Sequence, residues 1–296
     1  QTFSGLDLQY IPSAGNFLTV DLGQNALPIY ELLLQKGVIV RPIEVYGLPN
    51  HLRVSIGLPH ENERFSTALA EVLNNFQSSI EDLEVDLQKM TELTINNLKA
   101  SINGLIQRDS AACSSVIASD EEINELEKDI DQKGIRIIML YQPVASDLRL
   151  VTSIMKVSPN LERIGDQSVG IAKRARKMNK NPECPESSLT QPLHDLALSQ
   201  LENAYLAFKN RDVDLALEVK KKDKDLNLIC KELAKKLTKK MESDASRIKD
   251  YLDLHYIARS LERIGDYSKN ICEDAIFLES AVDIRHGGEL PETENS

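Results

Sequence analysis

The chain has 296 residues, of which 42% are hydrophobic and 27% are charged, and this composition is typical of a folded globular protein rather than a disordered one. No apolar run approaches the ~18 residues needed to cross a bilayer, so we expect no membrane insertion. The formal charge of −11 disfavours nucleic acid and anionic membrane surfaces as main partners, because an acidic surface repels both.

The first residues indicate how the chain was processed, and the cysteines indicate the cellular compartment. The chain starts with Gln1 and shows no signal-peptide pattern, so we expect it to begin inside a longer reading frame or to have been trimmed. Four scattered cysteines without a CxxC pair predict unpaired thiols in a reducing cytoplasm; these are Cys113, Cys184, Cys230 and Cys272.

Residues 1–76 are rich in chain breakers, with 6 glycines and 5 prolines, whereas the remaining 220 residues hold 7 and 6. This difference predicts a change of architecture near residue 76. Three short segments rich in β-branched residues, 16–21, 36–41 and 51–56, predict strands. Helices are predicted over 26–35, ending at Gly37, and over 61–74, so the segment is expected to be a small α+β unit.

From residue 79 onward, hydrophobic residues recur at steps of three and four, as expected for helices with one buried face. The first predicted helix ends before Asp109, an N-cap candidate; the second runs to about 141 and the third from Pro143 to about 178. After a linker at 179–188, helices are predicted over about 189–210, 212–241 and 246–280, and residues 283–296 are expected to be a disordered tail. The predicted domains are 1–76, 77–180, 181–282 and this tail.

The strongest local signal is a duplication. The hexamer Leu-Glu-Arg-Ile-Gly-Asp at residues 161–166 recurs unchanged at 261–266, and residues 120–124 align with 223–227. A repeat of this length indicates a duplicated domain, so we predict a mainly α protein with two tandem three-helix bundles. Gly165 and Gly265 each lower helix stability by about 1 kcal/mol relative to alanine, which indicates close approach between helices.

The repeated hexamer places two carboxylates one turn apart on the same helix face. Such pairs repel each other on a bare helix, but a hard cation reverses the sign, since oxygen ligands suit Mg, Mn, Ca or ferric iron. The second predicted helix supplies a further pair, but its aligned positions in the second bundle are Cys230 and Ala234, where Asp223 or Glu273 is a candidate substitute. The predicted metal ligands are Glu127, Asp131, Glu162, Asp166, Glu262 and Asp266. The alternative is a solvated acidic face with ordinary salt bridges to Arg163 or Arg263.

Residues 142–149 and 160–166, together with 257–266 and 270–273, resemble the two repeats of the PhoU family in motif, order and spacing. The resemblance covers about residues 77–282. It implies two three-helix bundles, metal at the carboxylate motifs, and a cytoplasmic regulator that restrains phosphate import and damps phosphate-starvation signalling. The implied partners are a phosphate ABC transporter and a phosphate-sensing histidine kinase. Two departures from the family pattern are Asn160, where Asp is common, and Gly170, where the second copy has Asn270.

Residues 11–17, 37–42, 46–57 and 61–65 resemble the C-terminal end of histidinol-phosphate aminotransferase, an enzyme of histidine biosynthesis. In that enzyme the arginine at the position of Arg53 binds the substrate carboxylate, a role that suits the guanidinium fork. Transamination requires a lysine that forms a Schiff base with PLP, and Lys36 is the only lysine in residues 1–76 and precedes a predicted strand. PLP is therefore not expected, and the segment is a remnant in a fused reading frame or a join made in assembling the sequence.

Three hypotheses follow from the sequence. The first is a non-enzymatic, metal-associated regulator, because no Ser/His/Asp set, Walker loop or cofactor lysine is evident. His194 and His255 are expected to be core or surface residues rather than general bases. The second is an aminotransferase that the front segment completes with another chain, and the third is a structural adaptor without metal. Assembly into a homo-oligomer is left open.

Overall fold

The computed structural model describes residues 3, 6 and 8–285. The predicted tail lies outside the described residues from 286 onward. The chain divides into two compact units: one holds the residues up to Val85 with Gln132–Thr152, and the other holds Asp86–Asp131 with the chain from Ser153.

The first unit contains a four-stranded antiparallel sheet of order β1-β2-β4-β3. The strands are β1 (Tyr10–Ile11), β2 (Phe17–Asp21), β3 (Arg41–Ile43) and β4 (Leu48–Ser55), with a short 3₁₀ turn, η1 (Glu44–Tyr46), before β4. Helix α2 (Ala26–Gln35) matches its predicted bounds, and its N-cap Asn25 accepts a hydrogen bond from the Leu27 amide. Val20, Leu52, Ile29, Leu33 and Leu69 share one core, so sheet and helices bury a common apolar face.

The strand predicted over 36–41 is wrong for most of its length. Residues 36–38 end α2 instead: Gly37 has φ +71°, and the Val38 amide donates to the Leu33 carbonyl. The chain enters the sheet only at Arg41, as the short edge strand β3, where the Pro42 nitrogen has no hydrogen to donate to a neighbouring strand. The predicted C-terminal glycine of α2 is therefore confirmed, and it displaces the strand.

Helix α3 (Pro59–Ile106) runs without a break through the change of architecture predicted near residue 76. No glycine or proline occurs from residue 60 to residue 103, so the chain breakers of the first segment end at Pro59. Buried Phe65, Leu69, Val72, Phe76 and Ile80 follow the same helical spacing on both sides of position 76. The change of composition therefore coincides with the start of α3 at Pro59, and the helix is unchanged at residue 76.

The helix predicted over 109–141 is divided into α4 (Ser110–Ala118) and α5 (Asp120–Tyr141). Asp109 is the N-cap of α4, since its Oδ1 accepts from the Ala111 and Ala112 amides at 2.9 and 3.0 Å. The division falls at Ser119, whose hydroxyl hydrogen-bonds with Asn97 Oδ1 of α3 at 2.9 Å. The third helix, α6 (Ala145–Met178), contains Pro159 without interruption.

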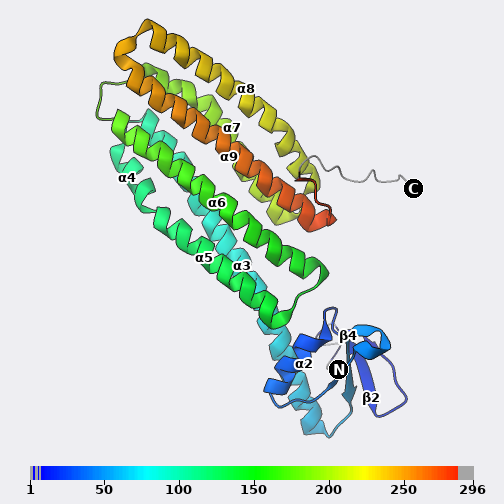
Figure 1. The fold of residues 1–296 in the computed structure, drawn as a ribbon. Helices are drawn as coiled ribbons and strands as arrows, with labels where there is room; N and C mark the ends of the chain where they lie inside the picture. Colours follow the sequence, from blue (N-terminus) through cyan, green and yellow to red (C-terminus); the bar gives the residue numbers. More distant parts are fainter. Residues whose placement is uncertain (1–2, 4–5, 7, 286–296) are drawn as a thin grey trace, which may run out of the picture. The chain divides into compact units, whose positions relative to one another are not determined.

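The second repeat begins with a 3₁₀ segment, η2 (Pro185–Thr190), and contains α7 (Gln191–Asn210), α8 (Val213–Ser243) and α9 (Ile248–Ser280), with η3 (Ala245–Arg247) before α9. These three helices pack against one another around Leu201, Leu226, Leu233, Leu254 and Ile257 (Figure 1). The fold is mainly α: two tandem three-helix bundles preceded by a small α+β part, as predicted. Among the described residues, no helix is both long and apolar enough to span a membrane.

Candidate carboxylate sites on the duplicated helices

Each copy of the repeated hexamer lies where two helices approach closely. A Cβ on Gly165 of α6 would lie 3.1 Å from Ile123 Cδ1 of α5. A Cβ on Gly265 of α9 would overlap Leu226 Cδ2 of α8 and lie 2.8 Å from Gln200 Oε1 of α7. The glycines therefore permit the helix contacts that bring the carboxylates of neighbouring helices together.

In the first bundle, α5 and α6 each contribute two carboxylates to one cluster. Burial raises the pKa of Glu162, and the negative charges of Asp166, Glu127 and Asp120 raise it further against the opposing effect of Arg163. Burial and Asp166 likewise raise the pKa of Asp120, which Lys173 partly offsets. The four side chains thus form one mutually repelling group, the first acidic cluster, which any bound cation would stabilise.

Asp120 is a member of this cluster that the ligand prediction omitted. It is the first residue of α5, and its Oδ1 is buried without a hydrogen-bond donor among the described residues. The alignment of residues 120–124 with 223–227 carried the relevant signal, since it pairs Asp120 with Asp223. Asp131, by contrast, is exposed further along α5 and is not among the charges that act on Glu162 or Asp120.

In the second bundle, the corresponding cluster contains Asp223 of α8 with Glu262 and Asp266 of α9. Burial, Asp223 and Glu262 raise the pKa of Asp266, and Asp223 Oδ1 is buried without a described donor. Asp223, and not Glu273, is among the charges that act on Asp266, and Glu273 is ion-paired with Lys220 at 2.9 Å. These three carboxylates form the second acidic cluster.

The second acidic cluster differs from the first in charge. Cys230 occupies the position of Glu127 and lies 3.5 Å from Glu262 Oε2, and burial raises its pKa to about 11, so it is a neutral thiol. Arg259 forms an ion pair with Glu262, while the corresponding residue of the first bundle is Pro159. The second cluster therefore carries less uncompensated negative charge than the first.

Both clusters offer carboxylate oxygens, which are the ligands that hard cations prefer. Each cluster also holds one buried carboxylate oxygen that accepts no hydrogen bond from the described residues. In the part of the chain that the structure describes, however, no three His, Cys, Asp or Glu side chains converge in a ligand arrangement. Rotation of the side chains would be needed to bring the oxygens onto one ion. Metal binding therefore stays a prediction.

The other residues singled out by sequence serve local structure. Arg53 of β4 stacks over the Phe17 ring, with its guanidinium carbon 4.5 Å from the ring centroid. Lys36 follows α2 and pairs with Glu71 at 2.6 Å. His194 is buried in α7 with Nδ1 3.1 Å from Asp195 Oδ1, and burial lowers its pKa. The four cysteines are free and buried.

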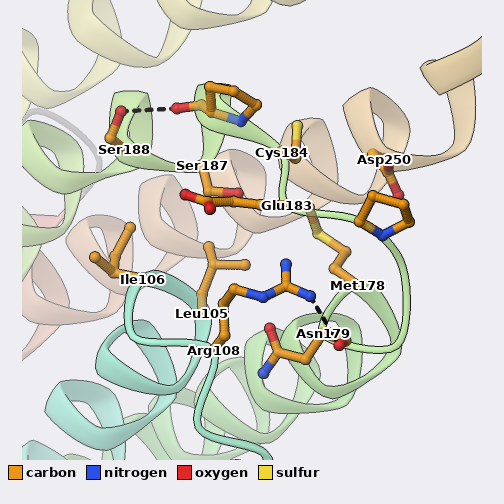
Figure 2. A pocket seen from close by; sticks show the side chains of 12 residues that line it. Leu105, Ile106, Arg108, Met178, Asn179, Glu183, Cys184, Ser187, Ser188 and Asp250 are labelled. Carbon is orange, nitrogen blue, oxygen red and sulfur yellow. Dashed lines mark hydrogen bonds between the residues drawn. The ribbon is translucent and has the colours of Figure 1, made fainter.

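A pocket at the linker between the repeats is small, about 120 Å³, and it is lined by the end of α3, the end of α6 and residues 182–188 (Figure 2). Arg108 enters it and donates from Nη2 to the carbonyl oxygens of Asn179 at 2.9 Å and Asn181 at 2.5 Å. These two hydrogen bonds attach the linker to the end of α3, so the role of the guanidinium is to stabilise the connection between the repeats.

A duplicated three-helix bundle with paired carboxylates on α6 and α9 defines a mainly helical tandem-repeat protein. Residues 87–175 and 191–275 each match the PhoU domain family. The chain belongs to the PhoU family. Residues 1–69 match a second family, aminotransferase class I and II.

Known relatives resemble both repeats. The phosphate-specific transport system accessory protein PhoU homolog of Pseudomonas putida is 35% identical over 218 residues, which are 73% of this chain and 85% of the relative. The accessory protein PhoU of Escherichia coli is 31% identical over 217 residues, 73% of this chain and 90% of the relative. The solved structure of PhoU from Pseudomonas aeruginosa superposes with a TM-score of 0.68 at 35% identity, covering 70% of this chain and 100% of that one.

Proposed function

We propose that the chain is a cytoplasmic, non-enzymatic accessory protein of a phosphate transport system. Its proposed partners are a phosphate-importing ABC transporter and the sensor histidine kinase that reads the state of that transporter, and its effect is to restrain uptake and damp the starvation signal. The observation that carries the proposal is the family match over both repeats, together with relatives named as accessory proteins of phosphate-specific transport.

Association with the transporter can be tested by co-purification from membranes. The full chain, carrying an affinity tag, is mixed with detergent-solubilised membranes that contain a phosphate ABC transporter, and the retained subunits are identified by mass spectrometry. We expect the transporter ATPase subunits and the sensor kinase to be retained, and an unrelated ABC transporter from the same membranes to be lost. Equal retention of both transporters would contradict a specific partner.

A metal cation, divalent or ferric, is proposed as the ligand of the acidic clusters. In the first cluster, Asp120, Glu127, Glu162 and Asp166 would hold it; in the second, Asp223, Glu262 and Asp266 would do so. The raised pKa values of Glu162, Asp120 and Asp266 support this proposal, because burial first and repulsion between neighbouring carboxylates second disfavour their charged forms, and a cation would offset both. When bound, the ion would tie two helices of a bundle together and compensate the cluster's negative charge.

Elemental analysis of the purified full chain tests the metal proposal. We expect bound metal in the parent protein and its loss in the double variant Glu162→Gln/Glu262→Gln. Asp131→Asn is the matched control: it removes a carboxylate of the same sequence motif that is exposed and does not act on Glu162, so we expect it to keep the metal. Metal retained in the double variant would exclude these clusters as the binding sites and favour an adaptor without metal.

The front part of the chain differs in origin from the helical repeats, as indicated by the match of residues 1–69 to aminotransferase class I and II. We propose that it is a remnant of such an enzyme, of the histidinol-phosphate type, and that it is inactive in this chain. In this arrangement Arg53 is stacked on Phe17, and Lys36 is engaged with Glu71. An absorbance spectrum of the purified chain after incubation with PLP tests this, and a bound-cofactor band would instead favour an aminotransferase completed by another chain.

A further inference from the structure

Two pockets between α6 and α9 are related by the internal repeat. One is lined by residues 255, 256, 259, 260 and 263 of α9 with 170 and 174 of α6. The other is lined by residues 155, 156, 159, 160 and 163 of α6 with 270 and 274 of α9. Every one of these positions differs from its counterpart by 100, so the repeat builds much of the same pocket twice. The second pocket is additionally lined by Lys220 of α8 and by residues 284 and 285.

Substitutions between the repeats have made the first of these pockets rich in arginine. Arg174, Arg259 and Arg263 line it, whereas the counterparts of the first two are Asp274 and Pro159. Ser260, Tyr256 and His255 add polar groups, and Asp166 is the carboxylate on its wall. We call this site the arginine pocket.

The guanidiniums of Arg174 and Arg263 remain available to a ligand. Arg174 is held in place, since its Nη1 donates to the Gly170 carbonyl at 3.0 Å and its guanidinium carbon lies 4.7 Å from the Tyr256 ring centroid. Arg263 is exposed, and neither arginine has an ion pair with a carboxylate among the described residues. Arg259 is the exception, since it pairs with Glu262.

Gly170 leaves the arginine pocket without the side-chain bridge that its counterpart has. In the counterpart pocket, Asn270 donates from Nδ2 to Asn160 Oδ1 at 3.1 Å and so bridges α9 and α6. Gly170 stands at the position of Asn270 and makes no such bridge; a Cβ there would meet only Arg174 Nη1, at 3.7 Å. The remaining volume, about 520 Å³, is enough for a small ligand.

The counterpart pocket also contains cations, Arg163 and Lys269 among them, and some of the others have carboxylate partners. Lys220 pairs with Glu273 at 2.9 Å, and Arg285 pairs with Asp283 at 2.5 Å. Lys156 lies near Asp274, a carboxyl of the same pocket, and its Nζ is 4.7 Å from the Phe277 ring centroid. The repeat therefore provides an internal comparison: a corresponding site that is also cationic, but in which lysines and an ion-paired Arg285 take the place of the free guanidinium of Arg174.

The geometry points to the arginine pocket as a binding site for a phosphoryl group, carried by inorganic phosphate or by a small phosphorylated molecule. Guanidinium forks match phosphate oxygens in two-point hydrogen bonds, and the Ser260 and Tyr256 hydroxyls are further donors. Asp166 opposes any anion, but the arginines outnumber it, so the net field is positive and a dianion gains more from it than a monoanion does. This site depends on its own residues and not on the proposed transport function.

Isothermal titration of the full chain at constant ionic strength tests the site, with inorganic phosphate and AMP as the two probes. A chelator is present throughout, so that metal at the acidic clusters does not contribute. We expect saturable binding of at least one probe; binding of AMP alone would identify a phosphorylated molecule rather than free phosphate as the ligand.

Variants at corresponding positions of the two pockets complete the test. Arg263→Gln is expected to weaken binding at least about tenfold, because it removes a charge-assisted contact, and Arg174→Gln to do the same. The matched control, Arg163→Gln, removes the counterpart of Arg263 and is expected to bind within about twofold of the parent. Since Arg263 is exposed, its variant is expected to fold even if that of Arg174 does not. Absence of binding by both probes, parent-like binding by Arg263→Gln, or equal loss in Arg163→Gln would overturn the proposal.

Discussion

Three glycines inside α6 and α9 allow the helix-packing interpretation of the repeat to be tested by alanine substitution. In an exposed helix interior, glycine to alanine stabilises a protein by about 1 kcal/mol. At Gly170 the added methyl group meets only ordinary contact distance, so Gly170→Ala should realise this gain. Alanine at Gly165 and at Gly265 is expected to give a smaller gain in unfolding free energy than alanine at Gly170, or a loss.

Gly265→Ala is expected to be destabilising, because its methyl group would overlap Leu226 and crowd Gln200. Both are side-chain ends that would move easily at a surface, but Leu226 is 0% and Gln200 is 2% exposed, so neither has room to move. Overpacking a core costs about 1–3 kcal/mol, which offsets or exceeds the helix gain. Gly165→Ala, at 3.1 Å from Ile123 Cδ1, should fall between the two.

Urea unfolding followed by helical circular dichroism measures this series. We expect the order of stability Gly170→Ala, Gly165→Ala, Gly265→Ala, with the first and last separated by about 1–3 kcal/mol. A Gly265→Ala protein as stable as Gly170→Ala would show that α8 and α9 do not approach as closely as described. The closeness of the second acidic cluster would then be refuted with it.

Further predictions concern pH, thiols and capping. Burial raises the pKa of Asp274 from 3.8 to about 6, so the native state holds this proton more tightly than the unfolded chain and stability should fall as pH rises between these values. Asp274→Asn should remove up to about 3 kcal/mol of that fall, measured by urea unfolding at pH 4 and pH 8; an unchanged pH dependence would contradict it. All four thiols should resist a thiol reagent in the native protein and react after unfolding, since each is buried; rapid native labelling would be inconsistent with this burial. Asp109→Ala should cost about 1 kcal/mol in the same urea assay through loss of the α4 N-cap, whereas no change would mean that the cap is not formed in solution.

Sequence periodicity predicted most of the helical architecture, because the buried positions of the bundles recur at strict helical steps. It failed where one local preference overrode another. A strand was expected over 36–41, but its first residues form the capping turn at Gly37 that ends α2. The composition predicted a boundary near residue 76, but α3 begins at Pro59 and continues through that position. The division at Ser119 depends on its hydrogen bond to Asn97, a contact between helices that no local pattern reports.

The candidate site was predicted in part. The duplicated hexamer correctly marked the faces of α6 and α9 that meet α5 and α8, because identical motifs on equivalent helices select equivalent contacts. Asp120 was missed since it has no carboxylate partner one turn away on its own helix, and spacing within one helix was the criterion. The neutral state of Cys230 and the pairing of Glu262 with Arg259 depend on burial and side-chain direction, which spacing does not encode.

The central claim, that this chain is an accessory protein which restrains phosphate import, is tested most directly by phosphate uptake. Cells that contain a phosphate ABC transporter but lack their own accessory protein are supplied with this full chain, and the initial rate of radiolabelled phosphate uptake is measured in phosphate-rich medium. The account predicts a lower rate with the chain than without it, and no reduction with the folded Glu162→Gln/Glu262→Gln variant if the acidic clusters are needed. An uptake rate that the expressed, folded parent chain leaves unchanged would contradict the account.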